Sequence, residues 1–195
     1  AADCGFYMWF QSLARDYVQG RPVCMSSLSM LPSLIVSLAN DDATIAIFTA
    51  NSTSLDPMKE LIEKECGLAL DNPRLQIVGC QDVPIFGEAV AKGLKVDVEG
   101  VTPHMVALAQ QKIKDNPTIS MFLFECTELP PYSDAVREAT GLPVYDAITG
   151  CQFFLSGYED NPRVGVTYQR GWSGTQDDYT FKANVTGDER NDFVN

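Results

Sequence analysis

Two cysteines in matching surroundings are the residues of this chain best suited to chemistry. Cys4 follows Asp3, and Cys126 follows Glu125 at the end of an apolar, strand-like run. A helical pattern begins shortly after Cys126, and a cysteine between a strand end and a helix N-terminus is biased toward the thiolate, the form that acts as a base. We expect the two thiols to face one cleft and to serve as base and acid on a C–H bond held between them.

The elements that would position these thiols alternate between strands and helices. Apolar runs rich in β-branched residues predict buried strands at 43–48, 75–79 and 119–124, with a shorter strand at 143–147. The helical spacing of apolar residues predicts helices at 5–18, 28–39, 57–66, 102–115, 133–140 and 148–155. Such alternation is typical of an α/β fold with mostly parallel sheets flanked by helices.

A hydroxyl-rich turn follows the predicted strand at 43–48. Its residues Asn51, Ser52 and Thr53 stand ahead of a predicted helix. Hydroxyls and loop N–H groups in this position can hold a carboxylate or a phosphate. The same side chains can instead serve only as caps of the helix, and both interpretations stay open at this stage.

Composition narrows the classes of partner. The net charge of −12 opposes binding to nucleic acid and to anionic membrane surfaces, although a local site can still accept a small carboxylate substrate. No apolar run is long enough for a membrane span. The six cysteines form no CxxC pair and the single histidine is His104, so the sequence predicts no metal site. We expect reduced cysteines, as in an intracellular compartment.

The motifs around the two cysteines and the turn resemble, in the same order, those of the aspartate/glutamate/hydantoin racemase superfamily. They are Asp3-Cys4-Gly5-Phe6, Thr49-Ala50-Asn51-Ser52 and Glu125-Cys126-Thr127-Glu128-Leu129-Pro130-Pro131-Tyr132. The resemblance covers roughly residues 3–155. Through the segment 4–11 and the acidic C-terminal stretch, the chain looks most like the eukaryotic algal dimethylsulfoniopropionate lyase branch.

The resemblance implies a specific fold and site. Members have two pseudo-symmetric α/β lobes, need no cofactor, and place one cysteine from each lobe on either side of the substrate α-carbon. Carried over, the catalytic residues are Cys4 and Cys126. The substrate carboxylate would be held by the turn residues and by the residue after the second cysteine: Asn51, Ser52, Thr53 and Thr127.

The same resemblance divides the chain. Residues 1–42 and 128–156 would form the first lobe and residues 43–127 the second. Residues 157–195 lie outside the resemblance to the racemases, and their glycines and acidic residues predict an extended tail. We expect a homo-oligomer with this tail at the interface. Superfamily members have a strand and a loop ahead of the first cysteine motif, and this sequence has almost nothing there, so we expect the first lobe to be incomplete.

The lyase branch implies β-elimination from a sulfonium substrate, which would release dimethyl sulfide and leave acrylate. A sulfonium cation gains from contact with aromatic faces, for which Tyr7 and Tyr132 are the candidates. Phe6, Trp9 and Phe10 have helical spacing and are expected in the core. Two alternatives stay open: an amino-acid racemase of the aspartate/glutamate type, and a non-catalytic assembly subunit descended from the same fold.

Overall fold

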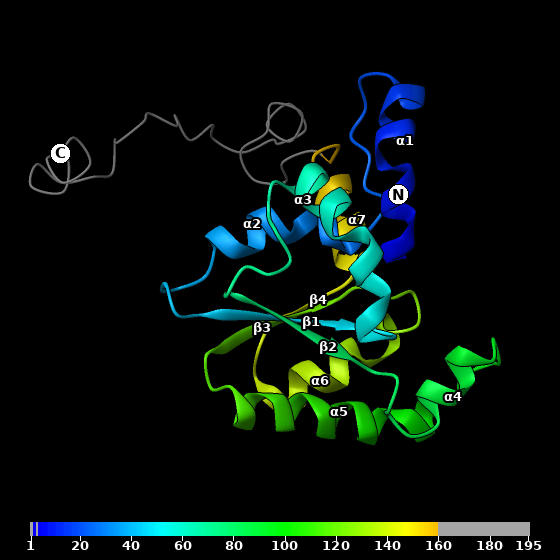
Figure 1. The fold of residues 1–195 in the computed structure, drawn as a ribbon, viewed down its shortest axis with the longest axis vertical. Coiled ribbons are helices and arrows are strands. Elements are labelled where there is room, and N and C mark those ends of the chain that lie inside the picture. Colours follow the sequence, from blue (N-terminus) through cyan, green and yellow to red (C-terminus); the bar gives the residue numbers. More distant parts are fainter. Residues whose placement is uncertain (1, 3, 160–195) are drawn as a thin grey trace, which may run out of the picture. The chain divides into compact units, whose positions relative to one another are not determined.

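The computed structural model describes residue 2 and residues 4–159 of the chain (Figure 1). Residues 1–157 form one compact unit, and a second unit covers residues 158–195. Asp3 and all but the first few residues of the predicted extended tail lie outside the described residues. The predicted oligomer interface in that tail therefore stays a prediction.

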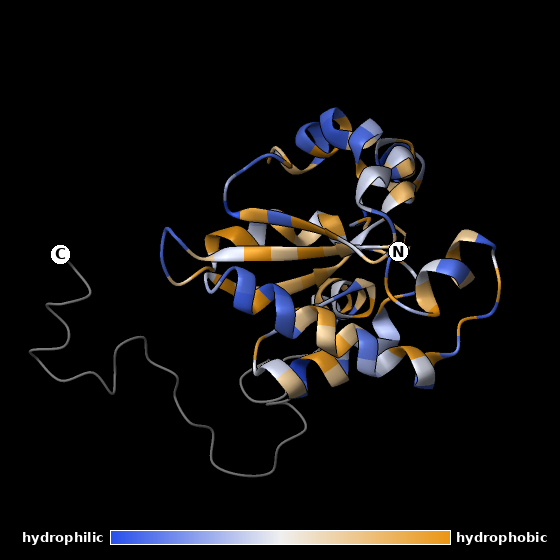
Figure 2. Cartoon of the chain, turned by 60° about the horizontal axis from the view of Figure 1, so that its bottom comes forward, coloured by the Kyte–Doolittle hydropathy of each residue, from blue (hydrophilic) through white to orange (hydrophobic). Residues whose placement is uncertain are grey.

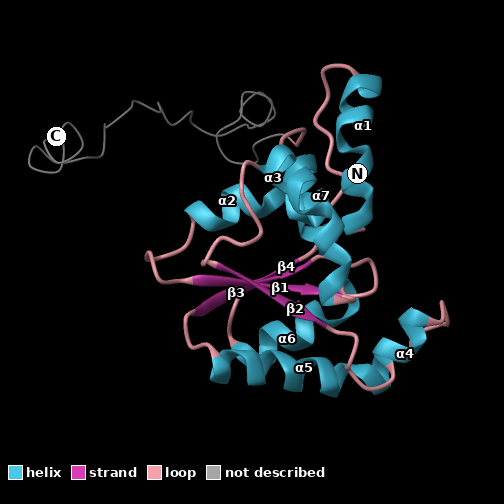
Figure 3. Ribbon diagram, in the orientation of Figure 1, coloured by secondary structure: helices cyan, strands magenta, loops and turns pink. Residues whose placement is uncertain are grey.

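A four-stranded parallel sheet is the centre of the first unit (Figure 3). Its strands follow the order β2-β1-β3-β4. They are β1 (Thr44–Thr49), β2 (Leu75–Gly79), β3 (Ile119–Phe124) and β4 (Val144–Tyr145). All six residues of β1 are buried, because this strand is paired on both sides and helices cover both faces of the sheet.

Helices form a layer on each face of the sheet. On one face lie α1 (Gln11–Val18), α2 (Leu31–Val36), α3 (Lys59–Cys66) and α7 (Ala147–Ser156), and on the other lie α4 (Phe86–Ala91), α5 (Val98–Asp115) and α6 (Ser133–Thr140) (Figure 1). Four 3₁₀ segments lead into helices: η1 (Gly5–Phe10), η2 (Ser27–Met30), η3 (Ser52–Met58) and η4 (Pro130–Tyr132). None of the described helices is both long enough and apolar enough to cross a membrane.

Two apolar clusters join these layers, one on each face of the sheet. Alternate residues of β1 serve both clusters: Ile45 and Ile47 pack with α2 and α3, while Ala46 and Phe48 pack with α5 and α6. The strands are accordingly apolar along most of their length, whereas the helices carry polar residues on their outer sides (Figure 2).

The central strand pair keeps its register up to the carboxyl edge of the sheet. Phe48 of β1 lies opposite Phe124 of β3, and the only irregularity in this pairing falls between Thr44 and Ile45, near the opposite edge. The backbone N–H of Glu125 donates to the carbonyl of Phe48 over 2.9 Å. The residues that follow the two strands therefore leave the sheet at the same level.

Most of the predicted elements are confirmed, and two of the predicted helices end at glycines. Gly67 and Gly141, with φ of +65° and +69°, adopt the left-handed conformation directly after α3 and α6. The helix predicted to begin at Thr102 instead begins one turn earlier, since the Asp97 side chain accepts from the Gly100 N–H and caps α5 there.

The prediction that the aromatic residues of the first helix are buried was wrong. Phe6, Trp9 and Phe10 are 50%, 54% and 51% exposed. Gly5, Met8 and Gln11 are the buried residues of this segment. Helical spacing identified a contiguous apolar surface correctly, but nothing among the described residues covers it.

The described residues form one sheet, so a second lobe is not shown by them. The predicted second lobe, 43–127, supplies β1, β2 and β3. Two elements predicted in the first lobe belong to the same layers. The strand β4 pairs with β3 in this sheet, and the helix α6 packs on α5. The fold is established as an α/β arrangement with one parallel sheet between helical layers.

Candidate active site

The candidate active site lies at the carboxyl edge of the sheet, where β1 and β3 end side by side. The chain leaves these neighbours in opposite directions, from β1 through α3 to β2 and from β3 through α6 to β4, and the two helices cover opposite faces (Figure 1). Such a switch point opens a crevice in which α/β proteins bind ligands. Thr49 ends β1 here, and Glu125 and Cys126 follow β3.

A buried carboxyl group joins three segments at this point. The Glu125 side chain is only 5% exposed, and it accepts hydrogen bonds from the Thr49 side chain and from the Gly5 backbone N–H. Burial raises the pKa of Glu125, and the two hydrogen bonds act in the opposite direction. The segment that carries Cys4 is thereby attached to the ends of β1 and β3.

The first predicted catalytic thiol, Cys4, lies close enough to affect the ionisation of the second, Cys126. Burial raises the pKa of Cys126 to about 11, and the Glu125 carboxylate and the Cys4 thiol add to this rise. A hydrogen bond from the Glu128 backbone favours the thiolate, as expected for a cysteine ahead of a helix, but the cost of burying the charge outweighs it. The expectation of a thiolate-favouring site at Cys126 is therefore corrected.

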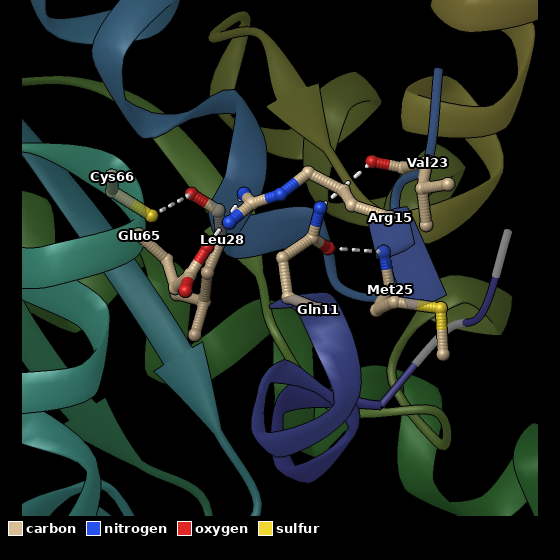
Figure 4. Close-up of polar contacts among 7 residues, drawn as sticks. All are labelled: Gln11, Arg15, Val23, Met25, Leu28, Glu65 and Cys66. Atoms are coloured by element: carbon tan, nitrogen blue, oxygen red, sulfur yellow. Dashed lines mark hydrogen bonds and ion pairs between the residues drawn. The ribbon is translucent and has the colours of Figure 1, made fainter. Parts of the chain in front are cut away.

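Polar side chains of α1 hold the Cys4 segment against the body of the unit (Figure 4). The buried Gln11 amide donates to the carbonyl of Val23 and accepts from the N–H of Met25, over 2.9 and 3.0 Å. One turn later, Arg15 forms an ion pair of 2.6 Å with Glu65 on α3. These contacts fix the helix that follows Cys4 at two points along its length.

The hydroxyl-rich turn after β1 acts as a cap of η3. The Asn51 side chain accepts from both the N–H and the hydroxyl of Thr53, and the N–H of Ser52 donates to the Gln81 side chain. These two N–H groups are thus engaged within the protein. Thr127, the fourth predicted carboxylate ligand, is exposed directly after Cys126.

The two predicted aromatic contacts lie in different surroundings. Tyr7, in η1 close to Cys4, is 45% exposed, and its ring lies 6.4 Å from that of Phe10. Tyr132 is fully buried, with its ring edge-on to Phe86 at 6.1 Å and its hydroxyl without a hydrogen-bond partner. The Tyr132 ring is therefore part of the core on the α5 side of the sheet.

The single histidine lies away from the two thiols. His104 is exposed on α5 and lines a pocket of about 520 Å³ beside the edge strand β2, together with Ser52, Gln81 and Lys112. Among the described residues, no group of histidine, cysteine and acidic side chains could hold a metal ion.

Three of the residues that build this site have no local sequence pattern that predicts their contacts. Gly5 and Thr49 occur within the motifs described above but have no pattern of their own, and neither has Gln11. Each acts through a partner far away in the sequence, so only the fold brings them together. Glu125 stands out in the sequence only as the acid before Cys126, and its hydrogen bond to the Gly5 backbone gives it a contact with the first cysteine segment.

Comparisons with known proteins relate the chain to one enzyme group. It is 52% identical to a dimethylsulfoniopropionate lyase of Durusdinium sp. clade D, over 97% of this chain and 62% of that protein. It is 53% identical to dimethylsulfoniopropionate lyase 7 of Emiliania huxleyi, over 100% of this chain and 58% of that protein. In sequence, the chain is thus similar to dimethylsulfoniopropionate lyases.

This chain thus spans about three fifths of the length of the two lyases it matches. No family model matches it. Among solved structures, the allantoin racemase of Pseudomonas fluorescens is similar over 91% of this chain and 81% of the racemase chain, with a TM-score of 0.43 and 13% identity.

Proposed function

We propose that this chain carries out the reaction for which its relatives are named, the cleavage of dimethylsulfoniopropionate to dimethyl sulfide and acrylate. The observation that carries the proposal is identity of 52–53% to two such lyases along essentially the whole chain. The electrostatic interaction of the Cys4 thiol with Cys126, at the switch point of the sheet, supports it, because two such thiols would supply an acid/base pair where α/β proteins bind ligands.

The proposed reaction is an elimination that needs no cofactor and takes place between Cys4 and Cys126. One thiolate takes a proton from the carbon next to the substrate carboxylate, and the electron pair of that C–H bond forms the double bond of acrylate. The bond from the β-carbon to sulfur breaks, and its electron pair leaves with dimethyl sulfide. The proton stays on the cysteine until it returns to solvent, so the step balances without an oxidant or a reductant.

The positive charge of the substrate would favour ionisation of the cysteine that acts as its base. Burial disfavours the Cys126 thiolate, but a sulfonium cation beside the sulfur would stabilise that thiolate by attraction. The exposed ring of Tyr7 can add about 0.5–2 kcal/mol through a cation–π contact. The substrate carboxylate would be oriented by the Ser52 hydroxyl, by the amide N–H groups of Asn51 and by Thr127, with the Thr53 hydroxyl exchanging its bond to Asn51 for one to the substrate.

We further infer that the protein has another lobe besides the one built on the described sheet, and that η1, α1 and α7 contribute to it. These elements belong to the predicted first lobe, and they expose large apolar residues: Phe6, Trp9, Phe10, Leu13, Ile148, Phe153 and Leu155. Exposed apolar groups gathered in this way mark surfaces that pack against further protein. An uncovered surface should bind the dye anilinonaphthalene sulfonate, and Trp9→Lys should reduce that binding. A chain that binds no dye would contradict the inference.

The test of the activity compares matched cysteine variants. Purified protein is incubated with dimethylsulfoniopropionate, and dimethyl sulfide and acrylate are quantified by gas chromatography and liquid chromatography. We expect both products in equal amounts, their loss in Cys4→Ala and Cys126→Ala, and their retention in the control Cys151→Ala, whose partly exposed thiol lies on α7. An unchanged rate in Cys126→Ala would overturn the mechanism.

The same preparations separate the alternatives. Loss of optical rotation from L- or D-aspartate or glutamate, without release of dimethyl sulfide, would favour the racemase. Inactivity on every one of these substrates would favour the assembly subunit.

A further inference from the structure

The buried Glu125 carboxyl group makes a polar contact with the Cys4 segment that the proposed proton transfer leaves unused. It directly precedes Cys126, and it binds the N–H of the residue that directly follows Cys4. We propose that Glu125 is a positioning residue, whose carboxyl group binds the Gly5 N–H and the Thr49 hydroxyl and so holds the Cys4 thiol beside the Cys126 thiol. The inference rests on the proposed function for its role, but its geometry can be tested without it.

The space at Gly5 shows how closely this contact is fitted. A β-carbon built at Gly5 would lie 1.3 Å from Oε1 of Glu125 and 2.3 Å from its Cδ. Gly5 is not among the glycines with positive φ, so its backbone conformation is open to other residues. The glycine is therefore required for room, since any side chain there would displace the carboxyl group from the backbone N–H.

The support for the carboxyl group on its other side is rigid. Thr49 is 1% exposed and ends the fully buried strand β1, which is paired in register with β3. Its hydroxyl also lies 3.5 Å from the carbonyl oxygen of Asn51, at the limit of a hydrogen bond. Because the carboxyl group is held by the last residue of a buried strand, it can fix the Cys4 segment relative to the sheet.

Other anchors of the Cys4 segment act further from the thiol. Gln11 and Arg15 fix α1, which begins beyond the 3₁₀ segment η1, whereas Glu125 contacts the residue next to Cys4. Loss of Glu125 should therefore alter the separation of the thiols while leaving α1 attached. Because Glu125 acts through Cys4 and not on the substrate, we expect its effect in kcat, with KM little changed.

The test measures the thiol separation directly. Dibromobimane becomes fluorescent when it bridges two thiols that lie close together, and peptide mapping identifies the bridged pair. We expect dibromobimane to bridge Cys4 and Cys126 in the unmodified 195-residue chain. In Glu125→Ala, the rate of bridging should fall by about tenfold or more, and kcat for dimethyl sulfide release should fall about 100-fold. Asp146→Ala is the matched control, since Asp146 is a buried carboxyl group bonded to Ser133 and to the Thr149 N–H.

A double-mutant cycle adds a readout that general destabilisation would not reproduce. Gly5→Ala should reduce bridging and kcat in the normal background, because the added methyl group collides with Glu125. In the Glu125→Ala background the same methyl group finds room, so Gly5→Ala should have little further effect. Additive losses would contradict the fitted contact.

Further variants cover a failure of Glu125→Ala to fold. Glu125→Asp withdraws the carboxyl group by one methylene, and Thr49→Val removes one donor while keeping the side-chain shape; each should slow bridging several-fold. Bridging equal to that of the unmodified chain in these variants, or in Glu125→Ala, overturns the positioning role. If bridging depends on Glu125 but no dimethyl sulfide is ever released, the positioning role stands and the proposed activity fails.

Discussion

The buried setting of Cys126 predicts that its thiol ionises only at strongly alkaline pH. Burial, with contributions from Glu125 and Cys4, raises its pKa from 9.0 to about 11. Near pH 8 the thiolate fraction then falls from roughly one in ten to roughly one in a thousand, a loss of about 100-fold in the reactive form. The direction follows from the charge: burial favours the neutral thiol, so more alkaline conditions are needed to remove its proton.

Alkylation by iodoacetamide measures this directly, because only the thiolate reacts. The rate of Cys126 modification, followed by mass spectrometry of its peptide, should rise about tenfold per pH unit between roughly pH 8 and 10, with a midpoint near 11. The same peptide in urea-unfolded chain is the control and should titrate near 9.0, its unburied value. Limited access to the sulfur would lower the plateau of the rate without moving its midpoint.

A midpoint at or below that of the unfolded control would refute the reasoning, since it would mean that local hydrogen bonds outweigh burial. The kinetics carry a related expectation. A lyase in which the Cys126 thiolate is the base should show kcat/KM rising through the same alkaline range, because that ratio reports ionisations of the free enzyme. A profile that is flat above neutrality would assign the base to another group.

Three substitutions test the surroundings of the site by urea unfolding. Tyr132→Phe should raise the free energy of unfolding by about 1 kcal/mol, because the Tyr132 hydroxyl is buried without a partner; a loss of stability would show that the hydroxyl is bonded in solution. Arg15→Ala should cost about 1 kcal/mol, since it strands the carboxylate of Glu65, whose side chain is 2% exposed, and Glu65→Gln should recover part of the loss; equal stability would mean that solvent replaces the pair. Gly141→Ala should cost about 1 kcal/mol through its φ of +69° alone, because no atom lies within 4 Å of the added carbon; an unchanged stability would contradict the strained conformation.

The sequence predicts the body of the fold well because its elements are marked locally. The runs that became β1 and β3 are continuous, apolar and rich in β-branched or aromatic residues, which is what strands buried on both faces require. Gly67 and Gly141 mark helix ends through a backbone preference that no other residue shares to the same degree. The α5 start was misplaced because Thr102-Pro103 imitates a helix start, while the true cap, Asp97, stands in a weakly patterned loop.

The site could be predicted only in its outline. The order of the motifs indicated Cys4 and Cys126, but the contact between Gly5 and Glu125 joins residues that only the folded sheet brings together. The exposed aromatic residues of η1 show a second limit. Periodicity indicates which residues share a surface, and it carries no information on what packs against that surface.

The in-register exit of β1 and β3 has a consequence for how this chain can tolerate changes of length. Removing or adding one residue within either strand would turn every following side chain to the opposite side of the sheet, which would separate Glu125 from Thr49. The loops at the opposite edge, 37–43 and 116–118, precede the strands, whereas Glu125 and Cys126 follow β3. Insertions that diversify such proteins, or that carry an engineered tag, therefore belong in those loops, about one strand length away from the thiols.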